Sequence, residues 1–259
     1  KLTSKLEETG AVGQKNTGTT VRFWPEASFF DTDRFAAADL RHTLKAKAVL
    51  CPGLKVRFEN ENTGEKEEWF YTGALGEYLL EQLGKADRLP KEPLTGKQGS
   101  AQDSVEWALA WAPDLTPGLA ESYVNLIHTA AGGTHESGLK DGLFNAVKSF
   151  CELHKLLPKG IKLLPEDVFS RASFVLSTRV LDPQFQGQTK ERLNSRDALR
   201  LVSTCIKPAF DLWLNQHIEY GKALAELCIR QAQTRSQTHT QTQTQTLSQT
   251  CCGRVRAAP

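Results

Sequence analysis

The sequence predicts a mixed fold of the α+β class. Short runs with an apolar residue at every second position, typical of strands, occur beside longer runs that have one at every third or fourth position, typical of helices. Of the 259 residues, 39% are hydrophobic and 24% are charged, which is the composition of a globular protein of one or two domains. Collagen-like, disulfide-scaffold and wholly disordered chains are excluded.

Each element of the first ninety residues follows from a local pattern and its stop signal. A helical stretch over 33–50 ends at a Pro-Gly pair, and two alternating stretches at 54–58 and 69–71 flank a polar turn, which predicts a hairpin. The predicted elements are a strand at 21–24, a helix at 33–50, strands at 54–58 and 69–71, a helix at 75–83 and a connector at 85–103.

A second block of strands and helices follows the connector. We expect Pro208 to kink the last helical stretch or split it in two, because proline removes a backbone donor. An apolar stripe along that stretch is read as a packing face. The predicted elements are strands at 105–111, 123–127 and 174–180, a helix at 139–150, and helices over 191–231.

The last residues differ sharply in composition. Residues 233–250 are mostly Gln, Thr and Ser, which cannot bury enough surface to offset the entropy of folding. We therefore predict a disordered tail over 233–259, and our hypothesis is that it is a simple-repeat or frame-shifted extension without function.

Charge, cysteine usage and the ends of the chain limit the class of protein. The net charge is +2, and because Arg235, Arg254 and Arg256 are the only charged residues after residue 231, the rest is near neutral and gives no charge argument for nucleic-acid binding. Four of the six cysteines lie in apolar stretches without paired spacing, so we expect them to be reduced in a cytoplasmic protein and to bind no metal, and we assign no role to the adjacent pair in the tail. No apolar run predicts a membrane helix. No Met occurs, even at position 1, so we expect a piece of a larger protein.

One loop combines groups that can bind an anionic oxygen. Residues 182–190 leave a strand and enter a helical stretch, with Gly187 for close backbone approach, Gln188 and Thr189 as donors and Lys190 as a positive charge. Alone, this pattern is more often a solvated loop.

Two further turns are less specific. The glycine-rich turn 132–138 matches no phosphate-binding motif, and we expect Thr134 to cap the helix that follows. Thr17 lies in a turn before a strand. No nucleophile elbow, carboxylate pair or metal cluster occurs in the pattern.

An ordered set of segments resembles the B subunits of bacterial type IIA DNA topoisomerases, and the middle segments resemble topoisomerase IV more than gyrase. The resemblance covers about residues 10–233. The segments that carry it are 16–25, 45–53, 121–127, 132–135, 157–163 and 182–193.

The resemblance implies a layout. Residues 1–90 resemble the C-terminal part of a GHKL ATPase α/β sandwich. Residues 91–232 resemble a ribosomal-protein-like transducer domain with a left-handed β-α-β crossover and long C-terminal helices.

The resemblance also implies site residues and partners. Lys190 matches the family's lysine that reaches the γ-phosphate of ATP, with Gln188 beside it, and Thr17 matches a threonine beside the adenine pocket. The implied cofactors are ATP and Mg²⁺. The implied partners are DNA, the A subunits of topoisomerase IV and a second B subunit in an A2B2 heterotetramer, with no membrane. The activity implied for the intact enzyme is ATP-driven strand passage, decatenation and relaxation.

Departures from the family pattern limit what this chain does alone. The boxes for the Mg²⁺-binding Asn, the adenine-binding Asp, the catalytic Glu and the glycine-rich lid have no counterpart here, so we expect the fragment alone to be inactive. Two alternatives remain open: a gyrase B fragment, and a non-enzymatic module that only packs against other subunits.

Overall fold

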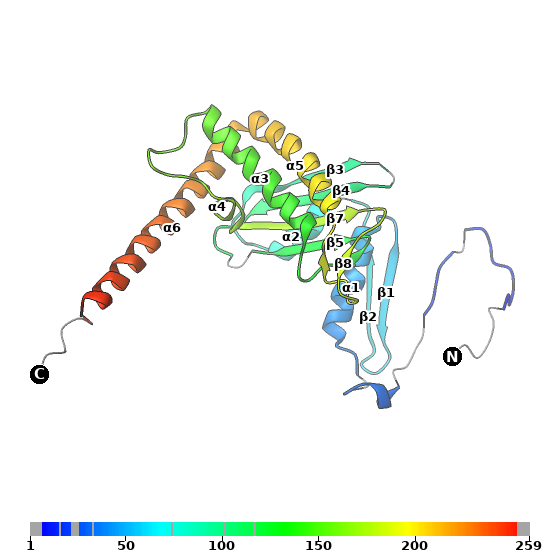
Figure 1. Cartoon of the computed structure of the whole chain (residues 1–259). Coiled ribbons are helices and arrows are strands. Elements are labelled where there is room, and N and C mark those ends of the chain that lie inside the picture. The colour runs from blue at the N-terminus through cyan, green and yellow to red at the C-terminus, as the bar shows by residue number, and fades with distance from the viewer. Residues whose placement is uncertain are drawn as a thin grey trace, which may run out of the picture. The chain divides into compact units, whose positions relative to one another are not determined.

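The computed structural model describes residues 7–15, 17–21, 26–32, 34–73, 75–100, 102–115 and 118–252 (Figure 1). The chain forms two compact units, Lys1–Thr43 and Leu44–Pro259. The predicted boundary near residue 90 lies inside the second unit and stays a prediction about the layout of the family.

The first unit has little regular structure among its described residues. It contains a short 3-10 helix, Ala27–Phe29, and the start of helix α1, Ala37–Leu50, which confirms most of the helix predicted over 33–50. Phe29 and Phe30 are exposed. Residues 22–24 of the predicted first strand lie outside the described residues.

The centre of the second unit is a five-stranded sheet in the order β3-β4-β7-β5-β6. Only β5 and β7 pair in parallel, and the chain between them passes through α3, so a β-α-β crossover is present. Its predicted left-handedness stays a prediction. The strands of the sheet are β3 (Leu89–Gly99), β4 (Ser104–Trp111), β5 (Ala120–Val124), β6 (Ile127–His128) and β7 (Ala172–Arg179).

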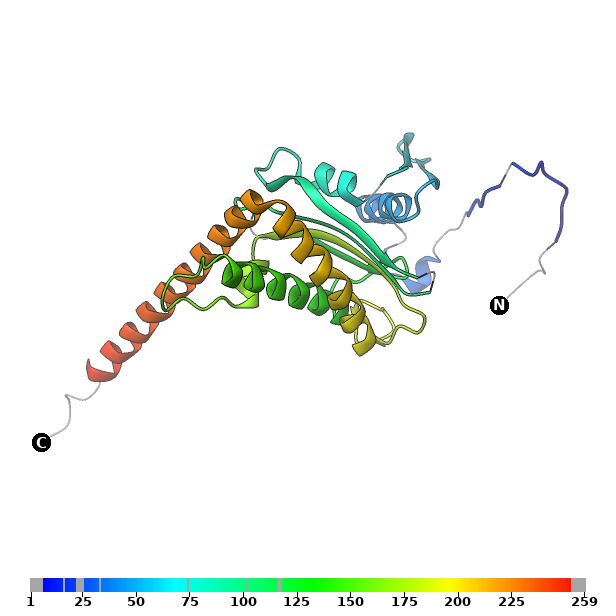
Figure 2. The ribbon, with the colours of Figure 1, turned by 90° about the horizontal axis from the view of Figure 1, so that it is seen from above.

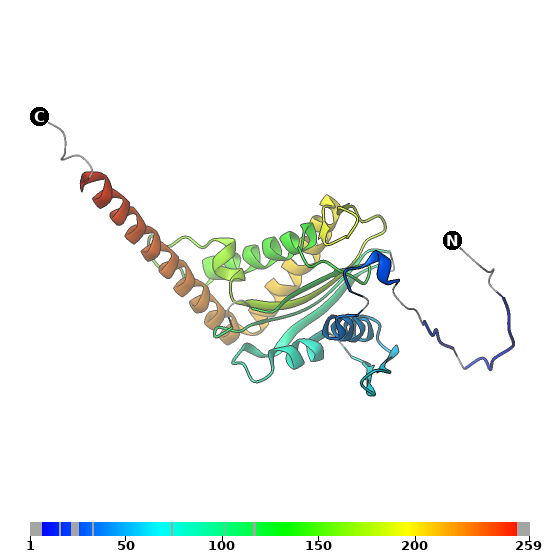
Figure 3. The same cartoon turned by 90° about the horizontal axis from the view of Figure 1, so that it is seen from below.

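Helices cover both faces of this sheet (Figures 2 and 3). One face packs against α3, α5 and α6, with Trp111 stacked on Phe210 at 5.6 Å between ring centroids. The other face packs against α2 and residues 46–50 of α1. Burial on both faces explains why β4 is buried at successive positions rather than at alternate ones. The remaining helices are α2 (Leu75–Leu83), α3 (Thr134–Leu153), α4 (Pro165–Phe169), α5 (Arg196–Gln216) and α6 (Ile218–Cys252).

Several local predictions are confirmed. Strands β1 (Lys55–Asn60) and β2 (Glu65–Phe70) form the predicted antiparallel hairpin, and α2 has the predicted bounds. Together with β4, β7 and α3, these elements confirm the α+β class. Among the described residues, no helix is long and apolar enough to span a membrane.

The predicted connector at 85–103 is wrong, because most of it is strand β3. Its Lys, Gly and Pro residues are tolerated because β3 is an edge strand with one unpaired side. Gly96 is required by packing, since a Cβ there would lie 2.1 Å from the ring of Trp107 on β4.

The predicted strand at 123–127 contains a turn that the pattern did not reveal. Asn125 and Leu126 have φ of 48° and 68°, and they turn the chain from β5 into β6. Asn125 also bridges to the end of β7, where its side-chain amide donates to the Val180 carbonyl at 2.8 Å. Asparagine adopts positive φ more readily than most residues, so its position here is the one local signal for the turn.

Of the two outcomes expected at Pro208, the split is wrong and the kink stays a prediction. Helix α5 runs through Pro208, and the chain breaks instead at His217. Pro208 and Thr204 are both exposed, so the Thr204 carbonyl that loses its helical donor can hydrogen-bond to water.

The prediction of disorder from residue 233 is wrong for residues 233–252, which continue α6. One side chain anchors the start of this polar stretch: Arg235 binds both carboxylate oxygens of the buried Asp167 at 3.0 and 2.9 Å. The Thr234 and Ser236 hydroxyls donate to carbonyls four residues earlier, which satisfies the hydroxyls but does not stabilise the helix. Residues 253–259 lie outside the described residues.

Candidate functional site

The loop that carries Lys190 is the tip of a small hairpin. Strands β8 (Phe185–Gln186) and β9 (Arg192–Leu193) pair antiparallel, and residues 187–191 connect them. Gly187 has a φ of 83° and Lys190 a φ of 59°. Residues 186–192 are all exposed, so the tip faces solvent.

Lys190 has no carboxylate partner among the residues that the structure describes. Its ammonium nitrogen lies 5.9 Å from the centroid of the Phe185 ring, a cation-π contact that leaves its hydrogen-bond donors directed to water. Gln188 and Thr189 are exposed beside it. The tip therefore presents one positive charge and two polar side chains, a combination that can bind an anionic oxygen.

The base of the hairpin is tied down, in contrast to the tip. The backbone N–H of Asn194 donates to the backbone carbonyl of Gln184 at 2.7 Å, and the backbone N–H of Gln184 donates to the Ser195 hydroxyl at 2.8 Å. Leu193 is buried in a small apolar cluster with Val124 and Ala198. The hairpin leads into α5 after only two residues, so α5 begins at a fixed distance from Lys190.

The structure brings the two loops that the sequence analysis singled out into direct contact. The Ala131 amide donates to the Glu191 carbonyl and the Leu193 amide donates to the Gly132 carbonyl, both at 3.0 Å, and Gly133 forms a parallel bridge with Leu193. The glycine-rich turn is thus the support of the Lys190 loop. The expected cap is wrong: Gly133 is the N-cap of α3, and no side chain caps the helix.

A buried polar network lies beneath this turn. The Ser122 hydroxyl donates to the Glu136 carboxylate at 2.7 Å and contacts the Thr129 hydroxyl at 2.6 Å, and that hydroxyl lies 3.0 Å from Nε2 of His135. His135 is 0% exposed, and burial lowers its pKa to about 4. The imidazole is therefore neutral at pH 7. The sequence signalled none of these pairings, because their members come from β5, from the segment after β6 and from α3.

A second buried cluster joins the opposite face of the sheet to α2. The Glu121 carboxylate accepts from the Tyr78 hydroxyl at 3.0 Å and from the Tyr123 hydroxyl at 2.8 Å. Burial, with the adjacent carboxylate, raises the pKa of both tyrosines. The one signal for this cluster in the sequence was Glu121 itself, an acidic residue beside the apolar residues of a strand.

Thr17 lies in the first unit, as an exposed residue without regular secondary structure. Its predicted place beside an adenine ring stays a prediction. Across the described part of the chain, no three His, Cys, Asp or Glu side chains group together as metal ligands. Cys51, Cys151, Cys205 and Cys228 are free thiols, as expected.

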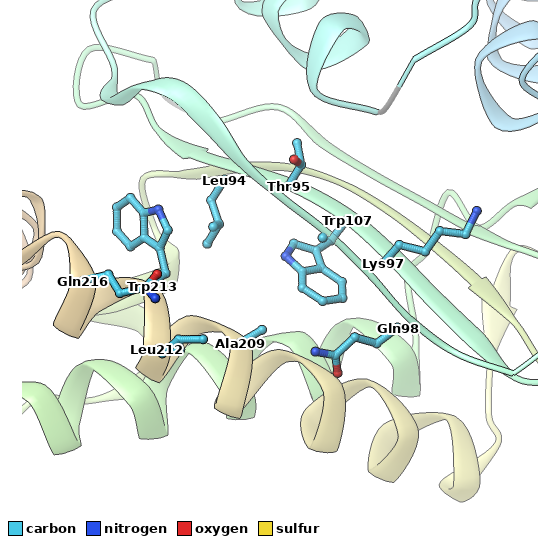
Figure 4. Close-up of a pocket in the computed structure, with 10 residues that line it drawn as sticks. Leu94, Thr95, Lys97, Gln98, Trp107, Ala209, Leu212, Trp213 and Gln216 are labelled. Atoms are coloured by element: carbon cyan, nitrogen blue, oxygen red, sulfur yellow. The ribbon is translucent and has the colours of Figure 1, made fainter.

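A hollow of about 250 Å³ lies elsewhere, between β3 and α5 (Figure 4). Its apolar lining includes Trp107 and Leu94 from the sheet and Trp213 from α5. None of the residues predicted to contact a nucleotide lines it, so the hollow is not part of the candidate site.

Comparisons with known proteins identify the family to which this fold belongs. A profile of the DNA gyrase B family matches residues 74–244. The B subunit of DNA topoisomerase 4 from Pseudomonas aeruginosa is 53% identical over 232 residues, which are 90% of this chain and 37% of that protein. The chain thus spans little more than a third of that relative.

Solved structures lead to the same family. The topoisomerase IV ATP-binding domain of Francisella tularensis, in complex with a small-molecule inhibitor, matches with a TM-score of 0.75 and 35% identity, over 90% of this chain and 63% of that one. The 43K ATPase domain of Thermus thermophilus gyrase B, with a TM-score of 0.69 and 23% identity over 85% of this chain and 59% of that one, shows the fold alone. The chain belongs to the DNA gyrase B family, as a segment that corresponds to the ATPase and transducer region of the topoisomerase IV B subunit.

Proposed function

We propose that the Lys190 loop contacts the terminal phosphate of ATP and reports its presence to helices α5 and α6. The observation that carries the proposal is the contrast within one hairpin, between an exposed ammonium without a described carboxylate partner and a base held by backbone hydrogen bonds. Gln188 is a neutral donor beside Lys190. By resemblance to the family, we assign Thr17 separately to the adenine side of the nucleotide.

The chemistry follows from charge. A lysine ammonium binds a phosphate oxygen through charge-assisted hydrogen bonds, and it loses that partner when the terminal phosphate is cleaved and leaves. Because α5 starts at Arg196, a change in the position of the loop is passed to the helix within a few residues. The loop is therefore suited to sensing the state of the nucleotide.

The metal that accompanies ATP in such enzymes is held elsewhere. The described residues contain no cluster of three metal-ligating side chains, so we assign no Mg²⁺ ligand to this chain and derive no step from the metal. The chain itself contributes the positive charge of Lys190 and the short connection from its loop to α5.

The wider role is that of a segment of an ATP-hydrolysing type II DNA topoisomerase. In this role the segment acts within a heterotetramer of two B and two A subunits of topoisomerase IV and couples the ATP cycle to DNA strand passage, decatenation and relaxation. The fragment alone is inactive because most of the nucleotide pocket belongs to the unmatched part of its relatives.

The test uses a chimeric B subunit, in which the matching 232 residues of the Pseudomonas aeruginosa protein are replaced by those of this chain and assembled with A subunits. Lys190→Ala should reduce ATP turnover by about 100-fold while DNA cleavage continues, because the ammonium acts only on the phosphate. Lys159→Ala, at an exposed lysine after α3, is the matched control and should leave turnover unchanged.

Undiminished turnover in Lys190→Ala would refute the assigned role. If the unsubstituted chimera binds DNA and its A partner without hydrolysing ATP, the non-enzymatic module is supported instead. ATP-dependent negative supercoiling by the holoenzyme restored from the chain's own full-length B subunit and its own A subunits, rather than by the chimera, would favour the gyrase alternative.

A further inference from the structure

Gly133 lies against the backbone of the Lys190 hairpin so closely that no side chain fits between them. A Cβ at position 133 would lie 2.3 Å from the Leu193 carbonyl oxygen and 2.6 Å from the Leu193 nitrogen. Its φ of 139° also disfavours other residues. Since both atoms belong to backbone, an added methyl group can be accommodated only if β9 moves away from α3.

The turn that carries Gly133 cannot move in place of β9, because buried hydrogen bonds hold the start of α3 against β5. Glu136 in the first turn of α3 accepts from Ser122, and a Cβ at Gly132 would lie 2.5 Å from that same carboxylate. Thr129 joins Ser122 to His135, whose ring is fully buried. Breaking this network leaves several buried polar groups without partners. A shift of β9 instead breaks the hydrogen bond from the Leu193 amide to the Gly132 carbonyl and loosens the packing of one apolar side chain, while the exposed tip of the hairpin offers no resistance.

Helix α3 also holds the start of α5. A Cβ at Gly138 would lie 2.4 Å from the Leu199 carbonyl oxygen, and one at Gly142 would lie 3.0 Å from Cβ of Ile206. Strand β9, which closes the Lys190 loop, therefore lies against the N-cap of α3, and the first turns of α5 lie against the face of α3 that carries Gly138 and Gly142. The loop and α5 share one support.

We propose that Gly133 is a positioning residue for Lys190: by letting β9 lie directly on the N-terminal end of α3, it fixes the distance between the Lys190 ammonium and the terminal phosphate. The proposal rests on the function proposed above for Lys190. Gly133 itself touches no nucleotide and acts only through the loop.

The experiment is a double-substitution cycle in the chimeric protein, with Gly133→Ala, Lys190→Ala and the pair. Displacing the hairpin by an ångström should lower kcat for ATP by about tenfold and leave KM within about twofold, because a misplaced group loses its contact to the reacting phosphate. The pair should have the turnover of Lys190→Ala alone. Gly160→Ala is the matched control, since Gly160 has a φ of 82° and nothing within 4 Å of an added Cβ.

A second variant guards against a failure of Gly133→Ala to fold. Thr129→Val keeps the shape of the side chain but removes its hydrogen bonds to Ser122 and His135, so the support loosens while the core stays filled. We expect a loss in kcat of about threefold that also disappears in the Lys190→Ala background. DNA cleavage by both variants should match that of the unsubstituted enzyme.

Two results would overturn the positioning role. One is an equal loss from Gly133→Ala in the presence and absence of Lys190, which would show that Gly133 acts independently of the lysine. The other is a rise in KM without a change in kcat. Failure of the proposed function has a different signature, because Lys190→Ala by itself would then leave turnover unchanged.

Discussion

Two turns meet beside β5 and β9, and their side chains have opposite surroundings. At the tip of the β8–β9 hairpin, Gln188 and Lys190 are exposed, and no described carboxylate pairs with the ammonium. At the start of α3, His135 is fully buried and Glu136 accepts from a neighbouring hydroxyl. The comparison indicates that Lys190, which is exposed to solvent, is positioned by the contacts of turn 131–133 with the hairpin and not by contacts of its own side chain. Substitutions should therefore reduce stability strongly in the buried turn and weakly at the tip.

The largest effect should come from protonation of His135. Its pKa falls from 6.5 to about 4 on folding, so the unfolded chain binds more protons between these values. Stability conferred by the neutral ring is complete above pH 6.5 and is lost as the pH falls toward 4, by about 3 kcal/mol in total.

Urea unfolding of the 259-residue chain at a series of pH values measures this loss. The variant His135→Asn, which does not titrate, should lose about 3 kcal/mol less than the unsubstituted chain over the same interval. Parallel curves for the two proteins would show that His135 is not the titrating group.

The next effect concerns Thr129, the centre of the buried network. Thr129→Val removes the hydroxyl contacts to the Ser122 hydroxyl and to His135 Nε2, while the Ser122 carbonyl keeps the Thr129 backbone amide as a donor at 2.9 Å. Because buried polar groups then lack a partner, the free energy of unfolding should fall by about 2 kcal/mol at pH 7. Thr63→Val, in the exposed turn between β1 and β2, is the matched control and should cost nothing measurable. Equal results for both threonines would contradict the importance of the network.

Gly187 provides an intermediate case at the tip. Its φ of 83° is unfavourable for alanine, but nothing lies within 4 Å of an added Cβ. Gly187→Ala should therefore cost about 1 kcal/mol, the strain of the backbone alone. Gly18→Ala, where space is also open and φ is not positive, controls for the added methyl group. A loss above about 3 kcal/mol would mean that the tip is packed rather than solvated.

The smallest effect on stability should be that of Lys190→Ala. The side chain is exposed and its ammonium lies over the Phe185 ring, so the free energy of unfolding should change by less than about 0.5 kcal/mol. Thermal unfolding of the chain measures it, beside the loss of turnover predicted for the chimeric enzyme. A destabilisation of about 1 kcal/mol or more would show that the ammonium holds the loop together.

The same contrast explains what the sequence could and could not predict. The β1–β2 hairpin, α2 and β4 are specified by neighbouring residues, and their patterns were sufficient. The expectation that the Lys190 loop enters a helix directly is wrong, because the loop is the tip of the β8–β9 hairpin and α5 begins only at Arg196. The contact between Gly133 and Leu193 joins residues about sixty positions apart, and no local pattern reveals it. The role of Lys190 came from the resemblance and stays a prediction.

Two of the errors have one cause, which is that a local signal was outweighed by the surroundings. The composition of residues 89–99 suggested a connector, yet pairing with β4 and the ring of Trp107 over Gly96 make it a strand. Pro208 suggested a split as one of two outcomes, yet its exposed position lets α5 continue. In both cases the deciding factor is the surroundings in the fold rather than the neighbouring sequence.

The glycines of α3 have a mechanical consequence. Where Gly138 and Gly142 face α5, α3 contributes no side chain, so only the stiff β-branched side chains of Val202 and Ile206 separate the two helices and little can absorb a displacement. The pair should move as one stiff body, and a shift that starts at one end should arrive at the other with little attenuation.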